Sequence, residues 1–235
     1  MGLNVKNAPG GSGGGSKVKQ PLIEVGGYPA RVVQIIDLGL QPQSYLGETK
    51  APCREINVTY ELVDEFCIDE RGEVQEDKPR WLSERFTLKN LKAEKAKSTL
   101  RYNAIDPNGK FDGDFTALIG QPCIVNVVHN AGSGKNAGQV YNNVGSISSV
   151  RPKDADKIAP LVNEAVVFLT DDPDIEVFNA LPEFMREIIK NNLEYQGSVL
   201  QTALDGKPAS KARLKAAEPE PEDAEDDDPD DWKDD

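Results

Sequence analysis

Trp81 and Arg85 lie four residues apart in the stretch 80–88, with Arg80 beside them. Aromatic rings offer flat surfaces on which nucleic-acid bases stack, and cations contact the phosphates between those bases. In an extended strand, residues 81 and 85 point to the same side. The stretch therefore predicts one surface that both stacks bases and neutralises phosphates.

Further aromatic and basic residues lie close to predicted turns. The segment 89–101 contains five basic residues and one acidic residue, Glu94. The glycine-rich loop 131–138 contains one lysine. Phosphate contacts from such residues weaken as salt rises. The complete predicted set of single-strand contacts is Tyr45, Lys50, Arg54, Arg80, Trp81, Arg85, Lys89, Lys92, Lys135 and Tyr141.

The last eighteen residues, from Glu218 onward, form an acidic tail. They hold twelve acids and Lys233, and they leave residues 1–217 with a net charge of only −2 out of the total of −13. So polar a segment cannot bury enough apolar surface to fold, which predicts a disordered tail. A tethered polyanion can occupy a basic groove until DNA displaces it. The predicted partner-binding residues are Asp226, Asp227, Asp228, Asp230, Asp231 and Trp232.

Residue types that support metal or cofactor chemistry are scarce. His129 is the single histidine, and Cys53, Cys67 and Cys123 lack metal-ligand spacing. We therefore expect no metal, no cofactor and no catalytic site. Free cysteines, no apolar signal segment and no membrane-spanning run favour a reducing cytoplasm, and no membrane partner.

Five predicted strands and one helix position these residues. The strands span 27–40, 53–66, 80–88, 123–130 and 139–150, and the segment 89–104 predicts a helix with Ala93, Ala96 and Leu100 on its apolar face. The order strand, strand, strand, helix, strand, strand is that of the OB-fold, a five-stranded barrel that binds oligonucleotides. The expected fold is mainly β, with accessory helices.

Four regions follow from these patterns. A flexible Gly/Ser-rich arm covers 1–20, the OB-fold domain 21–150, a helical appendage 151–204, and a disordered tail, basic and then acidic, 205–235. In the appendage, Pro182 suits the first turn of one amphipathic helix, with Met185, Ile188 and Ile189 as its apolar stripe and Gly197 at its end.

With these elements in place, the chain resembles the single-stranded DNA-binding proteins of bacteriophages. The resemblance rests on "LIGQPCIVNV" (118–127), "VYNNVGSI" (140–147), "LPEFMREII" (181–189) and the acidic tail. It implies sequence-tolerant binding of single-stranded DNA during phage replication, recombination and repair in the host cytoplasm. It also implies a tail that recruits replication proteins such as a polymerase or a helicase. A homodimer is compatible with the sequence.

Two other functions remain open on the sequence alone. One is a protein-interaction or DNA-mimic module, whose acidic tail binds basic surfaces while the barrel grips no nucleic acid. The other is a magnesium-dependent nuclease that would use Asp112, Asp114, Asp171, Asp172 and Asp174, although these acids lie in turn-like runs without basic or histidine partners.

Overall fold

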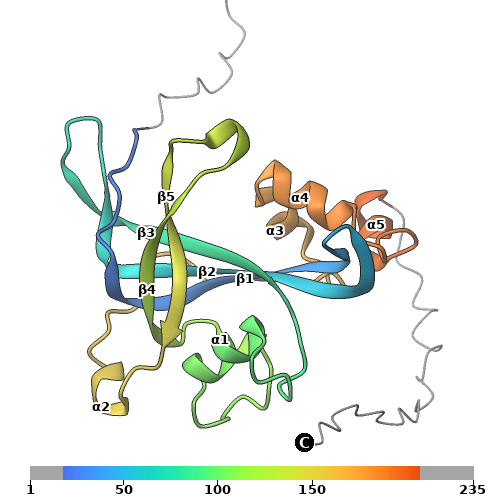
Figure 1. Cartoon of the computed structure of the whole chain (residues 1–235), viewed down its shortest axis with the longest axis horizontal. Helices are drawn as coiled ribbons and strands as arrows, with labels where there is room; N and C mark the ends of the chain where they lie inside the picture. Colours follow the sequence, from blue (N-terminus) through green and yellow to red (C-terminus); the bar gives the residue numbers. More distant parts are fainter. Residues whose placement is uncertain (1–17, 207–235) are drawn as a thin grey trace, which may run out of the picture.

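The computed structural model describes residues 18–206, and its fold is mainly β. A curled antiparallel sheet forms a half-barrel, and the helices are few and short (Figure 1). The strands are β1 (Gly26–Tyr45), β2 (Glu48–Ile68), β3 (Val74–Thr87), β4 (Pro122–Ala131), β5 (Val140–Ser148) and β6 (Val166–Phe168). The helices are α1 (Lys97–Ile105), α2 (Pro152–Ala155), α3 (Ile175–Ala180), α4 (Glu183–Lys190) and α5 (Val199–Leu204), and the single-turn helices are η2 (Thr116–Leu118) and η3 (Gly134–Asn136).

The strands lie in the order β3-β2-β1-β4-β5, all antiparallel. The predicted order of five strands and one helix up to residue 150 is thus confirmed. The short strand β6 was not predicted, and it pairs in parallel with residues 34–36 of β1. Within residues 18–206, no helix is long and apolar enough to cross a bilayer.

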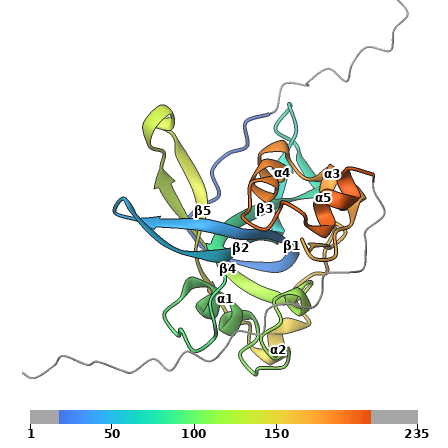
Figure 2. The same cartoon turned by 90° about the vertical axis from the view of Figure 1, so that its right-hand side faces the viewer.

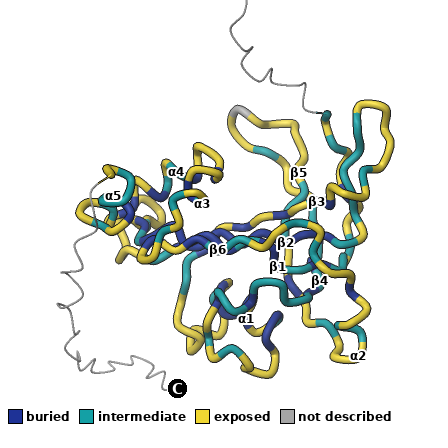
Figure 3. Tube along the Cα trace, turned by 180° about the vertical axis from the view of Figure 1, so that it is seen from behind, coloured by how far each residue is buried: buried dark blue, intermediate teal, exposed yellow. Residues whose placement is uncertain are grey.

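The main hydrophobic core fills the concave side of the sheet. Ile56, Val58, Tyr60 and Leu62 of β2 point inward, as their alternation with polar residues predicts. Burial of each such side chain contributes about 1.5–3 kcal/mol relative to exposure. Figure 3 shows burial concentrated in the middle of the strands, whereas the tip of the β4–β5 hairpin is exposed.

Glu84 interrupts the apolar side of β3, and the structure explains why. Its side chain is buried and accepts hydrogen bonds from Arg101 Nε at 2.8 Å and from the Tyr60 hydroxyl at 2.9 Å. Arg101, on α1, also donates to the Gly145 carbonyl of β5 at 3.1 Å. One arginine therefore bridges β3 and β5, the two edge strands of the described half-barrel.

A second core lies against the far half of β1. Ile36 and Leu38 pack there with Phe168 of β6, Phe178 of α3 and residues of α4 and α5. In Figures 1 and 2, α3–α5 lie on the opposite side of the sheet from α1 and α2. Because neighbouring residues of β1 point to opposite faces, this one strand contributes to both cores.

The prediction of one helix in the appendage was wrong, since four short helices, α2 to α5, lie within residues 151–204. Leu181 precedes a proline and adopts an extended conformation, with ψ of 148°, which separates α3 from α4. Pro182 lies at the N-cap of α4 rather than inside it. Met185 and Ile189 do face the second core, as their spacing predicts.

Two other predicted elements need correction. The segment 41–52, predicted as a loop, continues β1 and β2 into a long hairpin. The helix predicted over 89–104 begins only at Lys97, because Asn90 accepts the Lys92 backbone N–H in a turn. Its predicted apolar face was also wrong, since Leu100 is 53% exposed and Tyr102 and Ile105 are buried instead.

Gly39 provides a test of how β1 meets the second core. Its φ is +77°, and a Cβ there would lie 2.5 Å from Asn192 Cγ. Gly39→Ala should lower the free energy of unfolding by about 2–4 kcal/mol, from backbone strain and overpacking together. Gly72→Ala is the matched control, with φ of +81° and open space around it, and should cost only about 1–2 kcal/mol. Equal losses in urea unfolding would disprove the contact with Asn192.

Candidate nucleic-acid interface

Trp81 is a half-exposed aromatic ring held in one orientation. It lies on β3 with 43% of its surface exposed, and its indole N–H donates to Glu61 Oε2 at 3.0 Å. Glu61 is fully buried and also accepts from the Val162 backbone N–H at 2.7 Å and from the Asn163 side chain at 2.6 Å. Because its partner is fixed, Trp81 presents a fixed ring for stacking.

The segment that fixes Glu61 is itself tied to the outer face of the sheet. Arg31 of β1 donates to the carbonyls of Ala159 at 2.7 Å and Ile158 at 2.8 Å. Arg31 pairs in register with Glu61, which pairs with Trp81, so the three residues form one row across β1, β2 and β3. Neither Arg31 nor Glu61 was among the predicted site residues, because the partners that hold them, Ala159 and Val162, lie more than a hundred residues away in the sequence.

Arg85 shares the outer face of β3 with Trp81 and is paired with a carboxylate. It forms a close ion pair with Glu55 of β2, which also accepts from Gln43 Nε2 at 2.7 Å. The Arg85 side chain is 42% exposed, so it still offers part of its guanidinium to solvent. The pair lowers the net charge of this face, because Glu55 offsets Arg85.

Arg80 does not join this face. As the neighbour of Trp81 in a strand, it points to the opposite side of β3. There it lies near Tyr28, whose pKa is raised by burial and by Glu65, while Arg80 acts in the opposite direction. The structure therefore separates Arg80 from the Trp81 and Arg85 pair.

Two hairpins carry the remaining aromatic candidates. Tyr45, 66% exposed, ends β1, and Lys50 lies across that hairpin in an exposed 3.0 Å pair with Glu48. Tyr141, 40% exposed, is the second residue of β5, and its hydroxyl donates to the side-chain oxygen of Gln139. Lys135 lies in η3 between β4 and β5, but its side chain is outside the described part of the structure. Figure 1 shows the two hairpins extending in different directions, the β1–β2 hairpin to the right and the β4–β5 hairpin upward; in Figure 2 both extend to the left of the view.

The basic segment 89–101 divides into two groups. Arg101 and Lys97 both contact Glu84, Lys97 at 2.8 Å, so they serve the fold. Lys89 and Lys92 are exposed and make no ion pair with any residue that the structure describes. Figure 1 shows the chain after β3 turning toward α1, away from the side where the hairpin β4–β5 projects.

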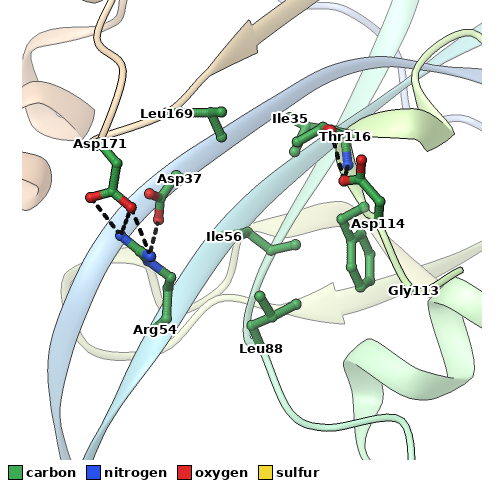
Figure 4. A pocket seen from close by; sticks show the side chains of 11 residues that line it. Ile35, Asp37, Arg54, Ile56, Leu88, Gly113, Asp114, Thr116, Leu169 and Asp171 are labelled. Atoms are coloured by element: carbon green, nitrogen blue, oxygen red, sulfur yellow. Dashed lines mark hydrogen bonds and ion pairs between the residues drawn. The ribbon is translucent and has the colours of Figure 1, made fainter. Parts of the chain in front are cut away.

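Arg54 lies in a carboxylate network rather than at a free surface. Its guanidinium is 3.2 Å from Asp37, 3.3 Å from Asp171 and 3.8 Å from Glu194. Figure 4 shows Arg54, Asp37 and Asp171 at one end of a cavity of about 270 Å³, whose walls include Ile35, Ile56, Leu88 and Leu169. Three acids around one arginine disfavour a phosphate, so Arg54 is better explained as a link between β2 and the segment after β6.

Three of the five acids considered for a nuclease have partners of their own. Asp114 accepts from the Thr116 backbone and hydroxyl, Asp171 pairs with Arg54, and Asp174 caps α3. Among residues 18–206, no group of three or more histidine, cysteine or acidic side chains is arranged to hold a metal. The predicted partner-binding residues of the tail, Asp226 to Trp232, lie outside the described residues.

Comparison of the sequence with protein-family models and with curated proteins identified no relative. No protein-family model matches the chain, and no curated protein matches it significantly in sequence. The function must therefore be argued from the fold and from the residues placed on it.

Proposed function

We propose that this protein is a non-catalytic, sequence-tolerant binder of single-stranded DNA, built on an OB-fold. This proposal is supported by the order β3-β2-β1-β4-β5, with α1 between β3 and β4, which is the order expected if an OB-fold barrel is opened between β3 and β5. In that fold, oligonucleotides bind the face of the second and third strands and the hairpins flanking it. The β1–β2 and β4–β5 hairpins would then flank the single strand.

The observation that carries the proposal is the fixed ring of Trp81 on the outer face of β3. Each stacked base contributes about 1–3 kcal/mol, and stacking is tolerant of sequence because every base has a flat face. Tyr45 and Tyr141 extend the stacking surface along the two hairpins. Among the predicted cations, Arg85 and Lys50 lie on β3 and on the β1–β2 hairpin, and Lys89 and Lys92 would contact only phosphates of a strand that continues past the end of β3.

A fluorescence titration tests this proposal directly. Trp232→Phe leaves Trp81 as the single tryptophan, so quenching by oligo-dT reports on β3 alone. If all four cations contact phosphates, the logarithm of affinity should fall against the logarithm of salt with a slope of about −3. No quenching at low salt would refute the proposal, and retained tail-dependent partner binding would then favour the DNA-mimic module.

The proposed setting is phage DNA replication, recombination and repair in the host cytoplasm. The acidic tail would recruit a replication protein, such as a polymerase or a helicase, and would compete with DNA for the basic side chains. The support for this competition is charge, since the tail from Glu218 carries a net charge of −11.

Deleting residues 218–235 should strengthen oligo-dT binding by about tenfold at low salt, because a tethered polyanion competes at high effective concentration. The gain should vanish at high salt, where the tail is screened. The same deletion should abolish capture of the replication partner. A full-length control with every tail acid changed to its amide should behave like the deletion in DNA binding. Unchanged affinity in both variants would contradict competition by charge.

A further inference from the structure

The tip of the β1–β2 hairpin holds a large apolar side chain in a backbone conformation that such side chains avoid. Tyr45 pairs with Glu48, so Leu46 and Gly47 form a two-residue turn. Both turn residues have positive φ, 50° for Leu46 and 84° for Gly47. Turns of this kind favour Asn-Gly, because asparagine and glycine adopt left-handed conformations at little cost. Leucine at the first position is therefore strained.

No contact within the described part of the chain compensates for this strain. Leu46 is 87% exposed, and Tyr45 beside it is 66% exposed. Between Gln41 and Pro52, Gln41 alone is buried. A two-stranded hairpin without a covering layer is marginally stable in water. An apolar tip on such a hairpin indicates contact with something outside the described part of the chain.

We propose that Leu46 and Tyr45 form a wedge that stacks on the last base pair of a duplex, where a single strand emerges from it. The preferred substrate would then be a junction between single-stranded and double-stranded DNA. This inference rests on the proposed single-strand binding, since Tyr45 and Lys50 of the same hairpin belong to that interface. Minor-groove proteins insert leucine side chains between base steps, which shows that an apolar side chain of this size can contact the flat face of a base.

The chemistry of the hairpin suits a base pair better than a second copy of the chain. Two adjacent apolar side chains match the size of one base step, whereas a stable protein interface buries more than about 1,000 Å². The other side chains near the tip are polar, and Glu48 pairs with Lys50 at 3.0 Å. The tip therefore carries no net charge to repel the phosphates of a junction.

The test compares oligo-dT alone with the same oligo-dT joined to a base-paired stem. The wild-type protein should bind the tailed stem about five- to tenfold more tightly, from one additional stacking contact. Leu46→Asn should bind both molecules equally, with unchanged affinity for oligo-dT. A fluorescent adenine analogue in the last base pair should brighten with the wild type and not with Leu46→Asn.

Leu46→Asn separates binding from folding, because Asn-Gly suits this turn better than Leu-Gly. Its midpoint of thermal unfolding should equal or exceed that of the wild type. Val74→Asn is the matched control, since Val74 is 63% exposed at the start of β3, beside the β2–β3 turn. This control should keep the preference for the tailed stem.

Three outcomes would overturn the inference. Equal wild-type affinity for the two molecules would overturn it while leaving single-strand binding intact. Binding to neither molecule would overturn it together with the proposed function. In the third outcome, Leu46→Asn keeps the preference for the junction, but sedimentation shows a smaller assembly in solution than the wild type forms. The tip would then contact a second copy of the chain instead.

Discussion

Arg101→Met should lower the free energy of unfolding by about 2–4 kcal/mol, because it removes the buried partner of a buried carboxylate, which keeps only Lys97 and the Tyr60 hydroxyl. Glu84 is nearly inaccessible to solvent, and Arg101 supplies two of its hydrogen bonds, from Nε at 2.8 Å and from a terminal nitrogen at 3.1 Å. The substitution also removes the donor to the Gly145 carbonyl, so the link between β3 and β5 is lost. Urea unfolding followed by circular dichroism measures the loss.

The matched control removes both charges together. In Glu84→Leu combined with Arg101→Met and Tyr60→Phe, neither the carboxylate nor the Tyr60 hydroxyl that donates to it remains, and buried ion pairs are often replaced by apolar residues without loss. This combined variant should therefore recover more than half of the stability lost in Arg101→Met. A combined variant less stable than Arg101→Met would show that the cost comes from lost packing rather than from the unpaired charge.

Trp81→Ala should weaken oligo-dT binding by about fivefold to a hundredfold, the equivalent of about 1–3 kcal/mol for one lost stacking contact. Stability should change less than in Arg101→Met, since Trp81 is 43% exposed. Anisotropy of a labelled oligonucleotide measures the affinity, because the variant loses the tryptophan signal at the site.

Trp81→Phe distinguishes the ring from its hydrogen bond. Phenylalanine keeps a flat aromatic face but cannot donate to Glu61, which retains the Val162 and Asn163 donors. Affinity close to that of the wild type is expected. If Trp81→Phe were as weak as Trp81→Ala, the orientation of the ring, rather than its stacking face, would carry the binding.

Local patterns predicted much of the sheet. The alternation of apolar and polar residues in 53–66 predicted the inward face of β2, because in a half-buried strand that alternation follows the burial of one face. The segment 41–52 was misassigned because Pro42, Gly47 and Pro52 are typical of loops. In the structure, a register shift between Gln41 and Gln43 accommodates Pro42 within β1.

The partners of the charged residues could not be predicted in the same way. Glu84 was an anomaly in β3 until Arg101 of α1 was placed beside it. From the sequence alone, Arg54 could not be distinguished from Arg85 as a candidate phosphate contact. In the fold, Asp37, Asp171 and Glu194 lie around Arg54. Such contacts depend on how distant segments meet, which no short stretch of sequence records.

Because β1 supplies Ile35 to one core and Ile36 and Leu38 to the other, the timing of synthesis matters. A nascent chain that has left the ribosome only as far as Val150 lacks β6 and α3–α5, and so exposes Ile36 and Leu38 to solvent. The burial of β1 is therefore complete only after α3–α5 have been synthesised. Premature termination after the half-barrel would leave an apolar strip on which chaperones and proteases act.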